Sequence, residues 1–239
     1  MDSQLFLILG AEGSGRAEFL AGLQEENSRI IVHVDEKATA IAAGIAPENL
    51  VPWKWIEGCI AIGGDIPPGF EIFFMAHGRE SPVTLVEGIR DWMKGKPVEL
   101  ARIITLVNCH LLYENEKSGR WYEACIHFSD VVLLGVRKGV PNRWVDGFIN
   151  SYRARNFPCI FRLIKKNFID RPGELLIPEA RRISLAFEDP EDAWDEQGNP
   201  IVESYFERDE AGRRTKWVPE ITVFLERQKS QPDNEELRS

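Results

Sequence analysis

The amino-acid sequence predicts an α/β fold in which helices cover both faces of a doubly wound, mostly parallel β-sheet, with a short β-hairpin extension near the C-terminal end. Three observations lead to this prediction. Short apolar runs alternate with stretches that suit amphipathic helices, a pattern typical of a sheet buried on both faces. A glycine-rich turn follows the first run, and the alternation stops near residue 170.

Each apolar run has the length of a buried strand. The first, at residues 5–9, consists of five consecutive apolar residues and leads into the glycine-rich turn. The segment 53–62 is predicted as a short strand or hairpin. The other strands are expected at residues 29–34, 71–75, 102–107, 130–136 and 158–164.

Helix signals lie between these runs. The first helix is predicted from residue 15 or 16 to about residue 25, with Phe19, Leu20 and Leu23 on one face. Pro82 and Pro141 suit the first turn of two later helices. The later helices are predicted at residues 82–94, 118–128 and 141–154.

The same patterns divide the chain into three parts. Residues 1–170 carry the alternating strands and helices and are expected to form one α/β domain. Residues 171–229 form a C-terminal extension, in which the segments around residues 209–212 predict a β-hairpin within 205–226. Residues 230–239 are polar and are expected to be disordered.

The overall composition limits the classes of partner. The formal net charge of −9 disfavours binding to nucleic acid or to an anionic membrane. No stretch approaches the length of a transmembrane helix, and the N-terminus lacks the basic segment of a signal peptide. The four cysteines are scattered, so we expect free thiols rather than a disulfide framework. We therefore expect a cytoplasmic protein without a membrane or nucleic-acid partner.

The glycine-rich turn is similar to a phosphate-binding P-loop, whose pattern is G-x-x-x-x-G-K-[ST] between a strand and a helix. Gly10 and Gly15 occupy the two glycine positions. Arg16 replaces the Lys that neutralises phosphate, and Ala17 replaces the Ser or Thr that binds Mg²⁺. The candidate phosphate- or nucleotide-binding residues are Gly10, Gly13, Ser14, Gly15, Arg16 and Ala17.

Further motifs follow in the order in which the CobW-type metallochaperone GTPases, a branch of the P-loop GTPases, carry them. After the second strand this family has a switch segment N-E-x-G, where the chain has Asp35 and Glu36 followed by Lys-Ala. The family then has a thiolate motif G-C-[IV]-C-C, of whose three cysteines only the first, Cys59, is present. The chain thus resembles the family over about residues 5–170, and the resemblance implies a P-loop NTPase-like fold.

Two strand ends lack the carboxylate that the resemblance implies. In the family pattern E-x-x-G-x-x-x-P, Met75 stands at the Glu position, while Gly78 and Pro82 match. The next strand ends V-D in the family and with Asn108 here. Carboxylates at these positions would support Mg²⁺ and its water. The resemblance therefore makes Asp35, Glu36, Met75 and Asn108 the switch- or metal-equivalent positions.

The guanine-recognition motif N-K-x-D of the family is also replaced. Gly135, Val136 and Lys138 stand at the equivalent positions, after a strand that otherwise matches. A carboxylate accepts hydrogen bonds from guanine, whereas an ammonium group has nothing with which to accept them. We therefore expect the chain to lack specific guanine recognition.

A metal site would need ligands other than the thiolate motif, because Cys59 alone does not supply the several soft ligands that such a site requires. Residues near predicted strand ends, or in the helix before the fifth strand, are alternatives. These residues are His77, Cys109, His110, Cys125 and His127. We prefer the interpretation that they are buried thiols and hydrogen-bonded histidines, and expect neither Zn²⁺ nor Mg²⁺ as a cofactor.

The residues and the resemblance together predict a pseudo-GTPase. It would act as a binding or scaffold module, with at most weak binding of phosphate or nucleotide, and its partner would be another protein or a second copy of the chain. Two alternatives stay open. One is an atypical NTPase that uses Arg16 for phosphate and Asp35 or Glu36 for a metal. The other is a metal-handling protein that uses Cys59 and nearby histidines.

Overall fold

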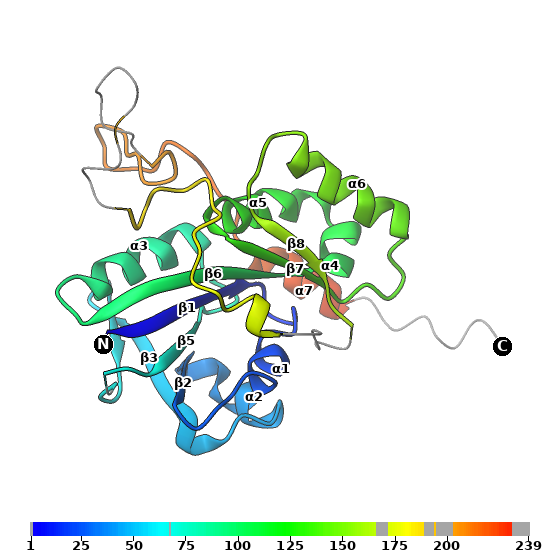
Figure 1. Cartoon of the computed structure of the whole chain (residues 1–239). Helices are drawn as coiled ribbons and strands as arrows, with labels where there is room; N and C mark the ends of the chain where they lie inside the picture. The colour runs from blue at the N-terminus through cyan, green and yellow to red at the C-terminus, as the bar shows by residue number, and fades with distance from the viewer. Residues whose placement is uncertain (1, 67, 166–171, 189–193, 195–202, 231–239) are drawn as a thin grey trace.

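An eight-stranded sheet forms the centre of the structure, a computed structural model that describes residues 2–66, 68–165, 172–188, 194 and 203–230 (Figure 1). The strand order is β4-β3-β2-β5-β1-β6-β7-β8, and only the β3–β4 pair is antiparallel. The strands are β1 (Ser3–Gly10), β2 (Ser28–His33), β3 (Leu50–Ile56), β4 (Cys59–Ile62), β5 (Glu71–Met75), β6 (Val98–Asn108), β7 (Val131–Gly135) and β8 (Ile160–Leu163).

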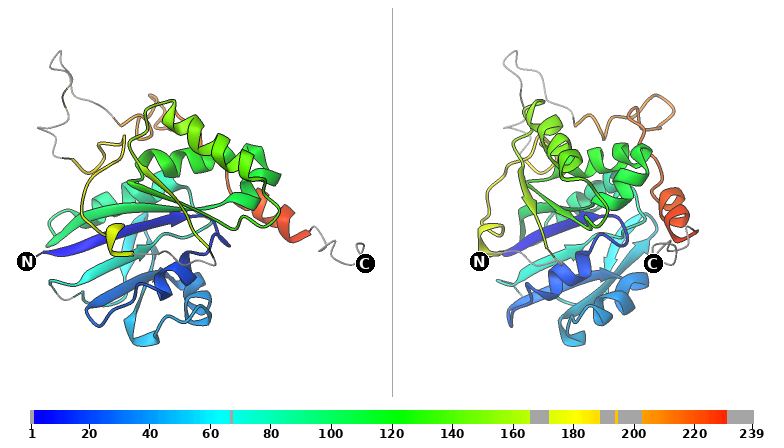
Figure 2. Two further views of the ribbon diagram at one scale, coloured as in Figure 1. Left: turned by 45° about the vertical axis from the view of Figure 1, so that its right-hand side comes forward. Right: turned by 90° about the vertical axis from the view of Figure 1, so that its right-hand side faces the viewer.

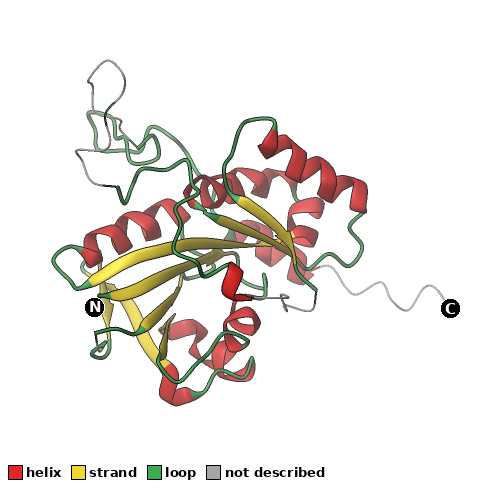
Figure 3. Cartoon of the chain, in the orientation of Figure 1, coloured by secondary structure: helices red, strands yellow, loops and turns green. Residues whose placement is uncertain are grey.

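Helices lie on both faces of the sheet (Figures 2 and 3). One face carries α1 and α2, whose buried residues share a core cluster, and the other carries α3, α5 and α6. In the described part of the chain the helices are α1 (Arg16–Ala21), α2 (Lys37–Ala42), α3 (Pro82–Met93), α4 (Cys109–Glu114), α5 (Gly119–Phe128), α6 (Asn142–Arg153) and α7 (Thr222–Ser230). This P-loop NTPase-like α/β architecture confirms the predicted fold class.

Strand β1 shows why the apolar runs are continuous. Leu5, Leu7 and Leu9 pack into the core on the α3 side, while Phe6 and Ile8 pack into the core on the α1 side. Successive side chains of a strand point to opposite faces, so a strand covered on both faces needs apolar residues at every position.

The topology places a ligand site at the carboxyl end of β1. This strand lies between β5 and β6, with α1 on one face of the sheet and α3 on the other. The connections on the two sides of β1 therefore run over opposite faces of the sheet. Open α/β sheets bind ligands at the carboxyl ends of the strands where this happens. The glycine-rich turn at residues 10–15 connects β1 to α1 at this place.

Most strand and helix predictions are confirmed, and the differences concern short elements. The segment 53–62 forms the antiparallel β3–β4 pair, although β3 begins earlier, at Leu50. The first helix ends at Ala21, about a turn before the predicted end, because Gly22 follows it. Helices α2 and α4 were not predicted: each has six residues, too few to show a helical period.

The C-terminal extension differs in part from the predicted hairpin. A tight turn around residues 209–212 is present, but it holds a single antiparallel bridge between Arg208 and Arg214. The end of the predicted hairpin segment is instead the helix α7, whose Phe224 and Leu225 are buried in the core on the α3 side. Of the predicted tail at residues 230–239, Ser230 is the last residue of α7, and residues 231–239 lie outside the described residues. No helix in the described ranges is long and apolar enough to cross a membrane.

Candidate functional site

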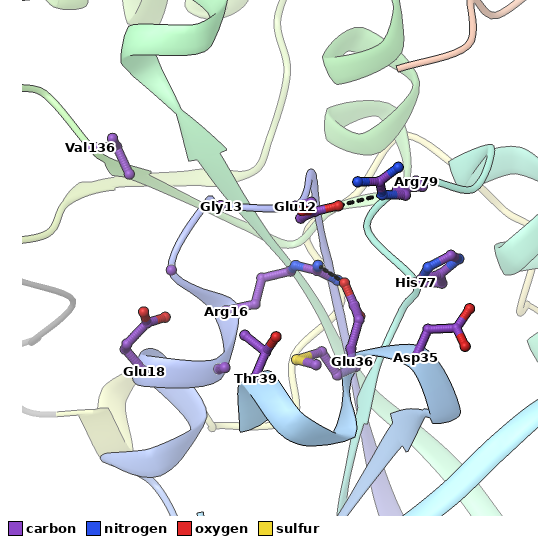
Figure 4. Close-up of a pocket in the computed structure, with 13 residues that line it drawn as sticks. Glu12, Gly13, Arg16, Glu18, Asp35, Glu36, Thr39, His77, Arg79 and Val136 are labelled. Atoms are coloured by element: carbon purple, nitrogen blue, oxygen red, sulfur yellow. Dashed lines mark hydrogen bonds and ion pairs between the residues drawn. The ribbon is translucent and has the colours of Figure 1, made fainter. Parts of the chain in front are cut away.

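A pocket of about 490 Å³ opens at the carboxyl ends of β1, β2 and β5 (Figure 4). Nine of the residues singled out from the sequence line it, and the remaining lining residues are Glu12, Glu18, Thr39 and Arg79. The nine are Gly13, Gly15, Arg16, Ala17, Asp35, Glu36, Met75, His77 and Val136.

Glycine is required at both ends of the turn that forms the pocket wall. Gly10 has φ of 141°, and a Cβ atom there would lie 2.6 Å from the carbonyl oxygen of Leu106. Gly15 caps α1 in the left-handed region, with φ of 88°. Both conformations are costly for residues with a side chain. Ser14 is fully buried between these glycines, so its hydroxyl does not reach the pocket.

The side chain of Arg16 folds back into the protein rather than toward solvent. Its Nη2 donates to Oε1 of Glu36 at 2.7 Å, and its Nη1 donates to the carbonyl oxygen of Ala76. The Arg16 residue is only 5% exposed. Arg16 comes from the start of α1 and Glu36 from the 3₁₀ turn η1 (Val34–Glu36), so this pair joins two elements across the pocket.

The loop after β5 closes against the glycine-rich turn. The N–H of Glu12 donates to the carbonyl oxygen of Gly78 at 3.0 Å, and the N–H of Gly78 donates to Oε1 of Glu36 at 3.3 Å. A Cβ atom on Gly78 would lie 2.2 Å from Nη2 of Arg16 and 2.5 Å from the nitrogen of Glu12. Only a glycine therefore lets the two loops approach this closely.

A second ion pair crosses the same gap. Arg79 donates from Nε to the carboxylate of Glu12, and this hydrogen bond to the carboxylate is the main reason that the pKa of Arg79 is raised. Among the described lining residues, the carboxylates Glu12, Glu18, Asp35 and Glu36 outnumber the guanidinium groups of the two arginines. The pocket is therefore acidic, and both arginine side chains already hold a carboxylate.

Three of the positions that the family resemblance relates to Mg²⁺ hold side chains engaged within the fold. Ala17 and Met75 are buried and offer no side-chain oxygen. Asn108 caps α4 by accepting from the N–H of Leu111 at 2.9 Å, and its amide donates to the carbonyl oxygen of Gly13 at 3.2 Å. The Asn108 side chain thus anchors the glycine-rich turn to the end of β6.

The three residues that the family resemblance places at base-recognition positions, Gly135, Val136 and Lys138, lie at or just after the end of β7. Gly135 packs against Ile164, because a Cβ atom there would lie 3.0 Å from the Ile164 side chain. Val136 has φ of 47° and borders the pocket, and its carbonyl oxygen accepts from the N–H of His110. Lys138 is exposed and does not line the pocket.

The structure brings together a set of metal-binding side chains that the sequence did not single out as a set. His33, Asp35 and His77 each offer one ligand atom, and these atoms lie within 4.8 Å of one another. His33 was missed, because its partner His77 is 44 residues away and the two meet only through the β2–β5 pairing. Burial, and next the neighbouring His77, lower the pKa of His33, so its imidazole is neutral near pH 7.

The other proposed metal ligands do not join this set. Cys59 is exposed on the edge strand β4, and Cys109 and Cys125 are buried thiols. Burial raises the pKa of Cys109 to about 12 and that of Cys125 well above its usual value, which makes both unreactive as thiolates. His127 is hydrogen-bonded to Glu203 at 2.8 Å.

No protein-family model matches the sequence, and no curated protein matches it. The chain is similar in structure to the Zn(II)-bound YjiA GTPase from E. coli, at 15% identity and a TM-score of 0.45. It is also similar to a Zn(II)-bound triple mutant of the YjiA GTPase, at 17% identity and a TM-score of 0.43.

Both alignments cover 74% of this chain, and they span 62% and 61% of the respective GTPase chains. The similarity between these structures and the chain concerns the fold.

Proposed function

We propose that this chain is a P-loop GTPase-like domain that does not hydrolyse nucleotides and that works by binding another macromolecule. The observation that carries the proposal is the state of Arg16. In a P-loop the basic residue at this position faces the β- and γ-phosphates. Here its guanidinium group is buried and holds Glu36 and the carbonyl oxygen of Ala76.

Nucleotide binding would have to break this arrangement. Moving Arg16 toward a phosphate leaves the Glu36 carboxylate without its ion-pair partner in a buried place. Breaking a buried pair costs about 3–5 kcal/mol. This cost would offset the favourable free energy of the phosphate contacts, so the proposal is that nucleotides bind weakly or not at all.

The pocket also lacks the groups that stabilise phosphoryl transfer. Ala17, Met75 and Asn108 stand where the family has a hydroxyl and two carboxylates near Mg²⁺. Asn108 is moreover engaged with Leu111 and Gly13. Without Mg²⁺ and a positioned water, little remains to stabilise the charge that develops in the transition state.

The negative charge of the pocket lining also disfavours nucleotide binding. Carboxylates outnumber guanidinium groups among the described lining residues. Phosphate groups approaching these carboxylates meet like charge at short range. The acidic lining therefore supports exclusion of nucleotides and favours cationic ligands.

Thermal unfolding in the presence of nucleotides tests this proposal. We expect the melting temperature to stay unchanged with GTP, GDP or ATP, with and without Mg²⁺. A nucleotide at a hundred times its dissociation constant would stabilise the fold by about 2.7 kcal/mol, so even moderate binding is detectable. A Mg²⁺-dependent shift with GTP that disappears in Arg16→Ala would contradict the proposal. Arg155→Ala, an exposed arginine far from the pocket, is the matched control.

A further inference from the structure

Two histidines and an aspartate meet at the edge of the pocket, and two of them, Asp35 and His77, line it. His33 is the last residue of β2, Asp35 lies in the turn η1 directly after it, and His77 lies two residues beyond the end of β5. Strands β2 and β5 pair in parallel, with Val32 opposite Met75. The carboxyl ends of the two strands therefore deliver both histidines to one place. Figure 4 shows Asp35 and His77 close together at the rim.

We propose that His33, Asp35 and His77 bind a divalent transition-metal ion, with Zn²⁺ as the ion whose ligand preference they match. Their ligand atoms lie within 4.8 Å of one another. Tetrahedral Zn²⁺ with bonds of about 2.0 Å holds its ligands about 3.3 Å apart. The ligand atoms must therefore approach one another by up to about 1.5 Å when the ion binds.

The atoms that face one another within the cluster are acceptors. Nδ1 of His33 accepts from the N–H of Asp35 at 3.3 Å, so it carries a lone pair, and it lies 3.6 Å from Oδ2 of Asp35. A lone pair and a carboxylate oxygen this close repel each other unless a positive charge lies between them. A bound cation removes that repulsion.

His77 supplies a second buried nitrogen. Its Nδ1 atom is buried and has no hydrogen-bond partner among the described residues, although Oε1 of Glu80 lies 3.7 Å away. A buried polar atom without a partner costs about 1–3 kcal/mol, and metal coordination of the imidazole offsets this cost.

The rings are held in place by packing. The His33 ring meets the fully buried Trp53 edge-on, with ring centroids 4.8 Å apart, and stacks on the His77 ring at 4.2 Å. Trp53 is itself fixed by a hydrogen bond from Nε1 to the carbonyl oxygen of Met75. The histidine side chains therefore lose little freedom when an ion binds, which favours affinity.

The ligand set selects the class of ion and its mode of binding. Imidazole nitrogens suit Zn²⁺, Ni²⁺ and Co²⁺, whereas Mg²⁺ prefers oxygen ligands. The Asp35 side chain is 73% exposed, so the site opens to solvent. Three protein ligands leave a fourth position for water, as in exchangeable or catalytic sites rather than closed structural ones.

Metal binding at this cluster goes beyond the proposed function and does not depend on it. The three ligands share no residue with the Arg16–Glu36 pair or with the glycine-rich turn. They include Asp35, one of the positions that the family resemblance relates to a metal, but not Cys59, the remaining cysteine of its thiolate motif. GTP turnover would refute the proposed function and leave the metal site standing.

Titration of the metal-free chain with Zn²⁺ against a chromophoric chelator tests the inference. We expect one equivalent to bind, with an affinity that falls at least about tenfold in His33→Gln and in His77→Gln. Asp35→Asn changes an exposed side chain, so it keeps the test valid if a histidine variant fails to fold. His110→Gln is the matched control, and Cys59→Ser tests the thiolate alternative. Both are expected to bind Zn²⁺ as the unmodified chain does.

Co²⁺ substitution identifies the ligands directly. Nitrogen and oxygen ligands produce visible d–d bands without a thiolate charge-transfer band, and we expect this spectrum to weaken in Asp35→Asn. No detectable Zn²⁺ binding, an affinity unchanged in all three ligand variants, or a thiolate band lost in Cys59→Ser would each overturn the inference.

Discussion

The guanidinium group of Arg16 forms an ion pair with the carboxylate of Glu36, with 2.7 Å between Nη2 and Oε1, at the centre of a P-loop-like pocket. The side chains are 4% and 12% exposed. The sequence suggested Arg16 as a phosphate ligand and Glu36 as a metal ligand. The ion pair joins these two residues to each other. Both groups are thus engaged within the fold, and the pair now links α1 to the turn after β2.

Breaking this pair is expected to destabilise the fold strongly. Arg16→Met and Glu36→Leu each leave one buried charge unpaired, so each should cost about 3–5 kcal/mol of unfolding free energy. The double variant should lose less than the sum of the two, because no unpaired charge remains. Urea denaturation of the four proteins gives the coupling energy.

The exposed pair Arg155–Glu123 is the control for that cycle. Its atoms are equally close, at 2.6 Å, but its side chains are 46% and 40% exposed. Solvent screening limits such a pair to about 1 kcal/mol or less. A coupling energy for Arg16 and Glu36 no larger than that of the control would contradict the account.

Gly78→Ala is expected to push the two pocket loops apart. The added methyl group would meet the backbone of Glu12 at 2.5 Å, which a side-chain rotation does not relieve. Such overpacking costs about 1–3 kcal/mol. Gly147→Ala is the matched control: it lies in α6 with nothing within 4 Å of the new atom, and it should stabilise the protein by up to about 1 kcal/mol. Equal effects of the two substitutions in thermal denaturation would be inconsistent with the close approach.

Asn108→Ala is expected to lower stability by about 1–2 kcal/mol, because the helix α4 loses its N-terminal cap. The glycine-rich turn also loses the hydrogen bond to Gly13, so faster amide hydrogen exchange is expected there. Asn150→Ala, an exposed change in α6, should alter stability by less than about 0.5 kcal/mol. Unchanged exchange in the turn would show that Asn108 does not anchor it.

Glu203 makes the stability of the fold depend on pH. Burial alone would raise the pKa of this carboxyl group, but hydrogen bonds from His127, Ser184 and the N–H of Tyr205 lower it overall. The folded state therefore favours the ionised form, and this contribution is present above the unfolded pKa near 4.5 and is lost as the pH falls through the folded pKa.

Unfolding free energies measured by urea at pH 7 and at lower pH test this dependence. Glu203→Gln removes the titrating group, so part of the acid-induced loss of stability should disappear. An identical pH dependence in Glu203→Gln and in the unmodified chain would refute this role.

The strands and the position of the pocket were predictable because they rest on local patterns. Residues 5–9 are apolar at every position since both faces of β1 are buried, and the glycines at 10 and 15 mark the turn. The helix α7 was mistaken for part of a hairpin, because it is short and its exposed Val223 forms a continuous apolar run with the buried Phe224 and Leu225, which hides the helical period.

Side-chain partners across the sheet were not predictable in the same way. The sequence suggested Arg16 as a phosphate ligand and Glu36 as a metal ligand, yet the two pair with each other over 20 residues of chain. His33 showed no local signal, because its site depends on the register between β2 and β5. Such contacts follow from strand order, which local periodicity does not encode.

Release of phosphate from GTP and Mg²⁺ under single-turnover conditions, with the protein in excess, tests the central claim most directly. The account predicts a rate equal to that of buffer alone, because Arg16 is held by Glu36 and the side chains at positions 17, 75 and 108 provide neither the hydroxyl nor the carboxylates that support Mg²⁺. Mg²⁺-dependent release that is abolished in Arg16→Ala and retained in Arg155→Ala would contradict it.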